Sequence, residues 1–325
     1  MRILPIFISH FGCPFKCIYC NQFDITKSRG INFNNITSQI KKFSRYQTSY
    51  DEIAFYGGTF TGLDIELQKK LLEIANTYAP QVPIRISTRP DFIDEGILDF
   101  LYKYNVRTIE LGIQSFSDSV LLASKRGYNS KTAIHSCDMI KKSPLKLSVQ
   151  LMPGLPSFSY DSLKITQKTT IQILPDYVRI YPTVVLKNTK LEKLYLAGTY
   201  QPLTIQEAID IVSELIISFE KVGIKIIKTG LHSDISEIVA GPYHESFGEL
   251  VRQETLFKNI RLNYKKNSTI VISMKDISLF KGYKGIMIKK LKSFAKVDKL
   301  PISIDKKLSK NQFYFSDKIK PDYIW

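Results

Sequence analysis

Three of the four cysteines lie close together near the start of the chain and offer thiolates for metal chemistry. Cys13, Cys17 and Cys20 are separated by three and then by two residues. They follow the apolar run Ile3–Ser9, which predicts a β-strand. Three thiolates from one loop can ligate three irons of a 4Fe–4S cluster and leave the fourth iron open to another ligand. The spacing therefore predicts a 4Fe–4S cluster on these three residues.

A zinc site and incidental thiols are the alternative interpretations of these cysteines. A structural zinc site takes four protein ligands, and His10 is the only nearby candidate for the fourth. The remaining cysteine, Cys137, falls in a segment of helical period, Lys131–Lys142. We expect Cys137 to pack there as a small apolar side chain.

The elements that must position the cysteine loop alternate along the first 230 residues. Short apolar, β-branched runs are separated by segments of helical period, which predicts parallel strands joined by right-handed crossovers. We expect a partial TIM-like (β/α)6 barrel over residues 1–240, with its chemistry at the carboxyl ends of the strands. The predicted strands are Ile3–Ser9, Glu52–Tyr56, Pro83–Thr88, Thr108–Ile113, Leu145–Met152, Tyr177–Val185 and Ile224–Thr229.

After Gly241-Pro242 the pattern changes, and we expect a small basic α+β lobe over residues 241–325. From Phe257 to the last residue there are 17 Lys or Arg against five Asp, so most of the formal charge of +16 belongs to this lobe. The predicted elements are a helix over Glu245–Phe257 and short strands over Ile270–Ser273, Gly285–Ile288 and Gln312–Phe315.

The cysteine spacing, with Tyr19 just before the last cysteine, resembles the radical S-adenosylmethionine (SAM) enzymes. In that family the open iron binds the amino and carboxylate groups of SAM. One-electron reduction then yields methionine and a 5′-deoxyadenosyl radical, which abstracts hydrogen from the substrate. The resemblance implies two cofactors, a 4Fe–4S cluster and SAM. The protein would orient these cofactors and the substrate and would exclude water from the pocket.

Further motifs match the family strand by strand and imply a set of SAM-binding residues. Gly57 and Gly58 would bind the methionine ammonium through their carbonyls, because paired glycines let backbone approach a ligand closely. Arg126 would pair with the methionine carboxylate, Gln114 with the ribose or carboxylate, and Gln150 with the ribose. The implied set is Tyr19, Gly57, Gly58, Thr59, Ser87, Gln114, Arg126, Gln150, Met152 and Gly154.

Within the family, the chain is most similar to the radical domain of Elongator's catalytic subunit and its bacterial relatives. The shared motifs are Gly57–Phe60, Ser87–Asp91, Gly112–Ser115, Arg126–Tyr128 and Met152–Pro156, and the resemblance covers about residues 3–255. Elongator modifies the wobble uridine of tRNA, so the resemblance implies a radical enzyme that modifies a nucleotide in tRNA or another RNA. Elongator's subunit also carries a C-terminal acetyltransferase domain. The 70 residues that follow here hold no acetyl-CoA-binding glycine pattern, so we expect an Elongator-like protein lacking that domain.

Two alternatives to this function come from different classes. Oxygen-independent coproporphyrinogen III dehydrogenase shares the barrel motifs, but it has a further cysteine where this chain has Asn21-Gln22, and typically a proline where it has Phe60. An Fe–S protein that binds RNA or senses redox state without catalysis is the other alternative. The complete set of cofactor-contacting motifs disfavours it, because a sensor would not require that set.

Substrate contacts are predicted in three places. Arg89 would lie toward the substrate. His244 could supply an acid or base, but a domain hinge followed by a helix start is the favoured interpretation of the segment around it. In the lobe, lysines interleaved with aromatic residues favour RNA, most simply tRNA, over a merely solvated lysine-rich face. The lysines are Lys265, Lys266, Lys289, Lys290 and Lys292.

The N-terminal residues show no signal-peptide pattern and the chain has no long apolar run, so we expect a cytoplasmic protein with reduced thiols and no membrane span. The family also implies a reducing partner such as flavodoxin or ferredoxin.

Overall fold

The computed structural model describes residues 2–8, 12–13, 17–21, 31–45, 50–231, 235–266, 268–282, 285–318 and 321–324. Contacts between residues divide the chain into two units. The first comprises Met1–Ala208 and Ser218–Glu245, and the second comprises Ile209–Ile217 and Ser246–Trp325. Each unit is described by itself.

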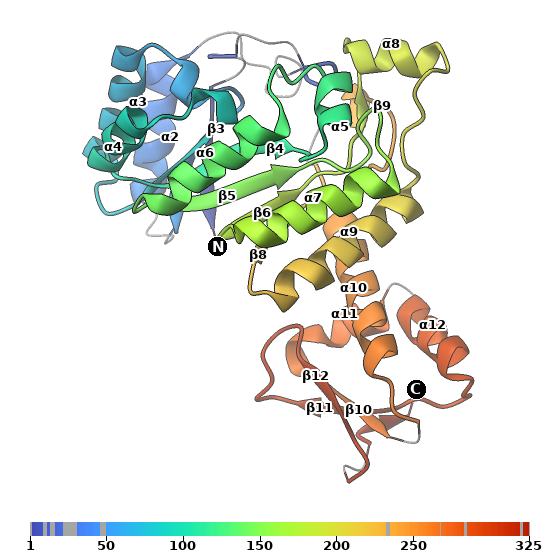
Figure 1. Cartoon of the computed structure of the whole chain (residues 1–325). Coiled ribbons are helices and arrows are strands. Elements are labelled where there is room, and N and C mark those ends of the chain that lie inside the picture. Colours follow the sequence, from blue (N-terminus) through green and yellow to red (C-terminus); the bar gives the residue numbers. More distant parts are fainter. Residues whose placement is uncertain are drawn as a thin grey trace. The chain divides into compact units, whose positions relative to one another are not determined.

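The first unit is built on a sheet of seven strands, all of whose neighbours pair in parallel (Figure 1). The sheet runs from β1 to β8 without a pair that would close it among the described strands, so it is a partial barrel. The predicted partial barrel is confirmed, and its seven strands match the seven predicted runs. In sheet order the strands are β1 (Ile3–Phe7), β2 (Glu52–Tyr56), β3 (Ile84–Thr88), β4 (Val106–Gln114), β5 (Lys146–Leu151), β6 (Tyr177–Ile180) and β8 (Lys225–Thr229).

Helices connect successive strands, as parallel pairing requires. Side chains of the residues before α3, α4, α6, α7, α8 and α9 each accept a hydrogen bond from a backbone amide of the first turn, which fixes where these helices begin. The helices are α2 (Phe33–Arg45), α3 (Ile65–Tyr78), α4 (Glu95–Lys103), α5 (Asp118–Ala123), α6 (Ser130–Lys142), α7 (Tyr160–Ile173), α8 (Lys190–Leu196) and α9 (Ile205–Lys221). A two-stranded antiparallel sheet joins β7 (Val185–Leu186) to β9 (Ile238–Ala240). Cys137 is fully buried on α6, as expected.

Alternating residues of the strands point to opposite faces of the sheet. One set is aliphatic and buried, for example Ile86 on β3, Leu111 on β4 and Val149 on β5. The other set is charged or polar and also buried, for example Arg85 on β3 and Glu110 on β4. The sheet therefore has an apolar face and a polar face, and both are shielded from solvent.

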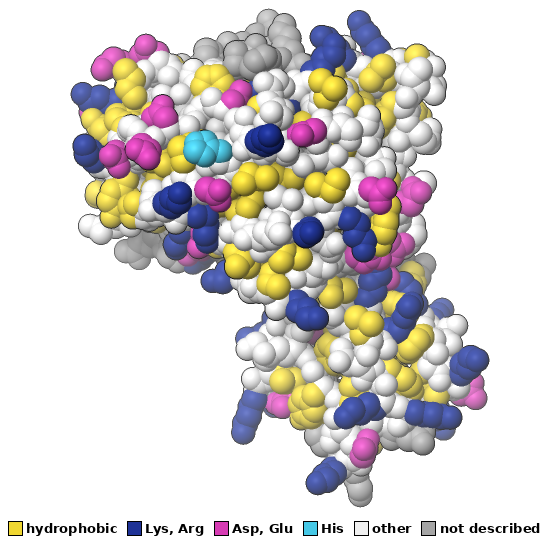
Figure 2. All heavy atoms as spheres, viewed as in Figure 1, with side chains coloured by type: hydrophobic (Ala, Val, Ile, Leu, Met, Phe, Trp, Pro, Cys, Tyr) yellow, Lys and Arg dark blue, Asp and Glu magenta, His cyan; other side chains and the backbone are white. Residues whose placement is uncertain are grey.

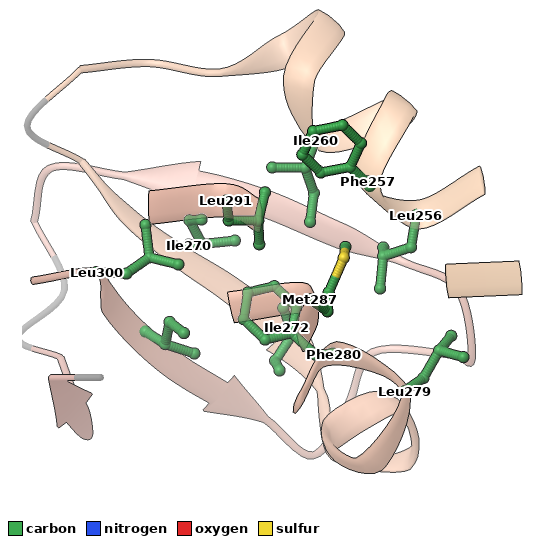
Figure 3. Close-up of a cluster of buried hydrophobic side chains, with 11 residues drawn as sticks. Leu256, Phe257, Ile260, Ile270, Ile272, Leu279, Phe280, Met287, Leu291 and Leu300 are labelled. Carbon is green, nitrogen blue, oxygen red and sulfur yellow. The ribbon is translucent and has the colours of Figure 1, made fainter. Parts of the chain in front are cut away.

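The second unit holds a small α+β fold with its own apolar core. Its sheet has the order β12-β10-β11-β13, in which β10 and β11 are parallel and both outer strands are antiparallel. Figure 3 shows buried side chains from α10, α11, α12 and this sheet gathered into one cluster, with Met287 and Phe280 near its centre. The elements are α10 (Phe247–Asn263), β10 (Thr269–Ser273), α11 (Ile277–Lys281), α12 (Ile286–Ala295), β11 (Pro301–Asp305), β12 (Phe313–Ser316) and β13 (Tyr323–Ile324).

One predicted strand of the lobe is wrong. Residues 286–288 begin helix α12 and do not form a strand. A short apolar run fits either element, and here the spacing of the buried Met287 and Leu291 completes a helical face. None of the helices in the described part of the chain combines the length and the apolar character that crossing a bilayer requires.

Candidate active site

The polar residues singled out in the sequence meet at one edge of the seven-stranded sheet. Tyr56, Thr88 and Gln114 close β2, β3 and β4, and Gln150 is the penultimate residue of β5. The carboxyl ends of parallel strands share an edge, and in such sheets this edge carries the chemistry. The motifs that follow these strands are therefore neighbours in space although they are far apart in the sequence.

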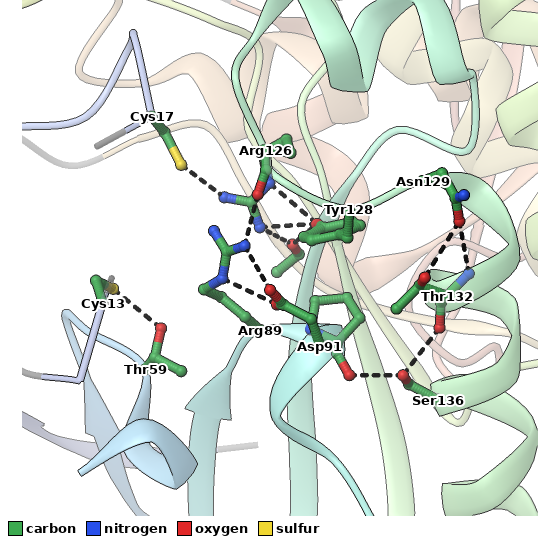
Figure 4. Close-up of polar contacts among 12 residues, drawn as sticks. Cys13, Cys17, Thr59, Arg89, Asp91, Arg126, Tyr128, Asn129, Thr132 and Ser136 are labelled. Carbon is green, nitrogen blue, oxygen red and sulfur yellow. Dashed lines mark hydrogen bonds and ion pairs between the residues drawn. The ribbon is translucent and has the colours of Figure 1, made fainter. Parts of the chain in front are cut away.

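The described part of the cysteine loop is bound to this edge (Figure 4). Cys13 Sγ lies 2.9 Å from Thr59 Oγ1, and Cys17 Sγ accepts a hydrogen bond of 3.0 Å from Arg126 Nη1. The Cys20 amide donates to the Cys17 carbonyl at 3.2 Å, and all three thiols are half-buried. His10, the alternative zinc ligand, lies outside the described residues.

Burial raises the pKa of the Cys13 thiol above its usual range. The hydrogen bond with Thr59 and the positive charges of Arg89 and Arg126 act in the opposite direction, while a negative charge on Cys17 would raise the pKa further. Two thiolates next to each other therefore need the neighbouring guanidinium groups or a bound cation to be stable.

Gly12 brings the cysteine loop against the loop after β2, and only glycine fits there. Its φ is +76°, and a Cβ at this position would lie 2.1 Å from the Thr59 carbonyl oxygen. The approach is mutual, because a Cβ on Gly62 would lie 2.3 Å from the Gly12 carbonyl oxygen. The sequence analysis did not single out Gly12 or Gly62, although each lies close to a recognised motif.

Replacing Gly12 with alanine should push the cysteine loop off this edge. The left-handed backbone alone costs an L-residue about 1–2 kcal/mol, and the clash with Thr59 adds to this cost. We expect less iron per chain after anaerobic reconstitution and a lower melting temperature. Gly198→Ala is the matched control, because Gly198 has a φ of +70° and nothing within 4 Å of its added Cβ. Equal iron content in the two variants would contradict the role of this contact.

Arg126 is the centre of the polar contacts. It is 5% exposed, and its Nη1 donates to Tyr19 Oη at 2.9 Å as well as to Cys17. Its Nε and Nη2 donate to Tyr128 Oη at 3.0 and 2.8 Å, and Nη2 also donates to the Gly112 carbonyl. A guanidinium with five donors is suited to such a branched set of acceptors.

The charge state of this cluster follows from burial. Burial raises the pKa of Tyr19 and of Tyr128, so both phenols stay neutral at physiological pH. Burial by itself would lower the pKa of Arg126, but Tyr128, Tyr19 and Cys17 together raise it above its usual range. Arg126 therefore places a permanent positive charge beside the Cys17 sulfur.

Arg89 is bonded within the protein in this structure. Its Nε and Nη2 donate to the two carboxylate oxygens of Asp91 at 2.9 and 2.8 Å. Its Nη2 also donates to the Arg126 carbonyl at 2.5 Å, and the residue is 4% exposed. These contacts give Arg89 a clear part in positioning Arg126, and its predicted place beside the substrate stays a prediction.

Gln114 and Gln150 form a second polar pair at the edge. Gln150 Nε2 donates to Gln114 Oε1 at 3.2 Å. Gln114 has a φ of +69° and lies at an irregularity in the pairing of β4 with β5. A positive φ is uncommon for a residue other than glycine, and at a strand end it marks local strain of the kind that clusters at active sites and ligand clamps. This strain is independent support for a functional edge.

The other predicted cofactor residues lie at the same edge or beside it. Gly57, with a φ of +95°, and Gly58 follow β2, and Ser87 lies on β3 opposite Glu110. Met152 packs against a buried cluster that includes Ile18 and Tyr19. Gly154 has a φ of +89°, and its carbonyl accepts a 2.6 Å hydrogen bond from Tyr200. His244 is exposed, and its acid–base role stays a prediction.

A buried network of charges on the polar face of the sheet was missed by the sequence analysis. Arg85 Nε donates to Glu52 at 2.6 Å and Arg85 Nη1 to Glu110 at 3.2 Å. Arg179 donates to Glu110 at 2.9 Å, and its guanidinium carbon lies 4.7 Å from the centre of the Tyr56 ring. The available signal was a charged residue at alternate positions of strands whose other residues are aliphatic.

The donor set at this edge fits a 4Fe–4S cluster and SAM. Three half-buried thiols come from one loop, and guanidinium charge lies beside two of them. No group of three His, Cys, Asp or Glu side chains within the described ranges is arranged to hold a single metal ion. The chemistry of the donors therefore favours a cluster that draws the three thiolates together over a preformed site for one ion.

Comparison with known proteins decides the family. Residues 7–169 match the model of the radical SAM superfamily, and residues 175–256 match that of the radical SAM C-terminal domain. The chain belongs to the radical SAM superfamily. Radical SAM enzymes use a 4Fe–4S cluster and SAM, so the two predicted cofactors are confirmed.

The relatives of this radical SAM enzyme include tRNA-modifying proteins. It is 28% identical over 310 residues to a "tRNA uridine(34) acetyltransferase" of Methanocaldococcus infernus, an alignment that covers 80% of this chain and 57% of that protein. It is 28% identical over 161 residues to "Elongator complex protein 3" of Saccharomyces cerevisiae, which covers 48% of this chain and 28% of that protein. The predicted kinship with Elongator's radical domain is thus confirmed. The chain spans about half the length of the first of these relatives.

Solved structures support the same kinship. The archaeal Methanocaldococcus infernus Elp3 with an N-terminal deletion has a TM-score of 0.65 and 25% identity, covering 81% of this chain and 65% of that chain. Coproporphyrinogen III oxidase from Escherichia coli has a TM-score of 0.52 at 17% identity, covering 79% of this chain and 58% of that chain. The second likeness shows the fold alone. It gives no support to the porphyrin alternative.

Proposed function

We propose that this radical SAM enzyme modifies a nucleotide in RNA, with tRNA as its substrate. The observation that carries the proposal is the docked cysteine loop, whose Cys17 thiol is bonded to Arg126 at the carboxyl edge of the barrel strands. The class of substrate is supported by the tRNA-modifying relatives, which share this part of the chain.

In this proposal Cys13, Cys17 and Cys20 hold the cluster. Gly57 and Gly58 present backbone carbonyls to the ammonium group of SAM, and Arg126 presents its guanidinium to the carboxylate. When bound, the cluster and SAM supply a one-electron cleavage that gives methionine and a 5′-deoxyadenosyl radical.

The other predicted contacts orient the nucleoside part of SAM. Gln114 and Gln150, already paired with each other, offer amide groups to the ribose, and Met152 offers an apolar surface to the adenine. Thr59 remains hydrogen-bonded to Cys13, and Arg89 remains hydrogen-bonded to the backbone carbonyl of Arg126. These two contacts hold the cysteine loop and the Arg126 guanidinium in position. Arg85 and Glu110 are buried and paired with each other on the polar face of the sheet.

The basic lobe supplies the RNA-binding surface in this proposal. Lys289 on α12 and Lys265 and Lys266 after α10 are exposed, whereas Lys290 is partly engaged, since it pairs with Glu254 and lies 4.3 Å from the centre of the Phe257 ring. Tyr264 contacts Phe294 and Phe315 edge-on, with ring centres 5.7 and 6.0 Å apart. Exposed lysines beside aromatic rings suit phosphates and bases together.

The reaction also needs one electron, which we propose comes from a carrier such as flavodoxin or ferredoxin. We place the enzyme in the cytoplasm, where tRNA is found and thiols stay reduced.

The test is the production of 5′-deoxyadenosine by the reconstituted enzyme with dithionite and SAM. It is measured with no addition, with bulk tRNA, with ribosomal RNA and with coproporphyrinogen. We expect tRNA to raise the yield and mass spectrometry to find a changed nucleotide in that tRNA. Stimulation by ribosomal RNA alone would identify an RNA other than tRNA as the substrate. Stimulation by coproporphyrinogen alone would overturn the proposal.

A further inference from the structure

Helices α5 and α8 cover the segment that carries Cys17 and Cys20. The Ile18 amide donates to the Ser124 carbonyl at 3.4 Å, just after α5, and the Ile18 carbonyl accepts from the Leu191 amide of α8 at 2.8 Å. Ile18 and Leu191 belong to one buried cluster, against which both cysteines pack. These two helices therefore pack against the segment that carries the two thiols.

That outer side carries lysines in excess over acidic residues. None of the lysines exposed there (Lys125, Lys187, Lys190 and Lys193) forms an ion pair with another residue in the described part of the chain. Three acidic residues lie nearby. Glu192 accepts a backbone hydrogen bond from Asn188 at 2.8 Å and Asp118 from Ser130 at 2.6 Å, and the Glu237 carbonyl accepts from the Lys187 amide at 2.9 Å. The exposed lysines are Lys125, Lys187, Lys190 and Lys193.

Exposed leucines stand among these lysines. Leu122 on α5 is 82% exposed and Leu196 on α8 is 72% exposed, and Leu194 is also exposed. We call these three leucines and the four lysines the α5–α8 face. Figure 2 shows dark-blue and yellow side chains together over α5 and α8. Exposed apolar residues beside charged residues are found at small, transient protein interfaces.

We propose that the α5–α8 face is the docking site of a small acidic electron carrier of the flavodoxin or ferredoxin type. The inference rests on the proposed function, because only a reductively started reaction needs such a partner. One electron passes from the reduced carrier to the cluster held by the cysteine thiolates, the carrier is oxidised by one electron, and no atom moves between the two proteins. Acidic side chains of the carrier would meet the lysines, and its apolar rim would cover the leucines.

RNA is the competing occupant of a lysine-rich surface, and the leucines argue against it here. Phosphates would satisfy the lysines but would leave Leu122 and Leu196 in water. The position over Cys17 and Cys20 also has a direct use for a carrier, since electron transfer becomes faster as the path becomes shorter.

The experiment compares two double charge reversals in the full chain. Lys190→Glu with Lys193→Glu changes the α5–α8 face, and Lys164→Glu with Lys168→Glu makes the same change of charge on α7. Binding of an acidic flavodoxin is measured by calorimetry at low and high salt. Cleavage of SAM is measured twice, once with reduced flavodoxin and once with dithionite, which needs no docking site.

We expect the α8 variant to bind flavodoxin roughly tenfold more weakly at low salt, with a smaller difference at high salt. Its flavodoxin-driven cleavage should fall while its dithionite-driven cleavage stays at the wild-type level, and the α7 variant should match the wild type in both. Unchanged flavodoxin binding in the α8 variant, or an equal loss in the α7 variant, would overturn the inference. So would competition for this face by tRNA with no binding of flavodoxin. Absence of cleavage with dithionite in the wild type would instead count against the proposed function, because the binding measurement does not depend on it.

Discussion

Cys17→Ala should abolish the iron–sulfur cluster and, with it, all cleavage of SAM. A loop with two thiolates cannot hold three irons of the cluster, and the Arg126 charge beside Cys17 would lose its sulfur partner. The measurements are iron and sulfide content and visible absorbance after anaerobic reconstitution, followed by the yield of 5′-deoxyadenosine. We expect all of them to fall to the level of unreconstituted protein.

Cys137→Ala is the control for this variant. Cys137 is fully buried on α6, and burial raises its pKa to about 12, so its thiol stays protonated and unreactive at the pH of the assay. This variant should retain its cluster and its activity. Retention of a full cluster in Cys17→Ala, or its loss in Cys137→Ala, would contradict the assignment of the ligands.

Arg85→Ala should destabilise the barrel by about 3–5 kcal/mol, because it leaves the buried Glu52 carboxylate without its cation and Glu110 with Arg179 alone. Arg85 is 0% exposed and is bonded to both Glu52 and Glu110, which are 5% and 1% exposed. The free energy of unfolding, measured by urea denaturation with circular dichroism, gives the loss directly.

Arg107→Ala is the comparison for Arg85→Ala. Arg107 lies on the next strand, β4, but its side chain is partly exposed, with its guanidinium carbon 4.4 Å from the centre of the Tyr102 ring. Removing it should cost about 1 kcal/mol or less. Similar losses in the two variants would mean that the buried network contributes little to stability.

The barrel could be predicted from the sequence because its strands are short β-branched runs between helical segments. Each of the seven predicted runs overlaps a strand of the sheet. The lobe was harder, since the run at residues 285–288 is too short to separate strand from helix, and β11 (Pro301–Asp305) was not predicted at all. Lysine-rich connections without strong turn signals hid its boundaries.

The residues of the site could be named, but their contacts could not. Tyr19 and Arg126 were each assigned to SAM, and the hydrogen bond between them joins positions 107 apart in the sequence. Arg85 and Glu110 were predicted only as strand residues. Only the assembled sheet shows that their side chains lie on the same face and pair with each other. Periodicity gives the side of a strand on which a residue lies, whereas the partner across the sheet depends on register.

The contact between Gly12 and Gly62 also limits how this site could be transplanted. A Cβ on either residue would meet backbone of the opposite loop, so each loop is shaped to receive the other. Moving the three-cysteine segment alone into another barrel would leave behind the loop against which it packs. A working graft would have to carry the loop after β2 as well, and would have to keep both chain lengths unchanged.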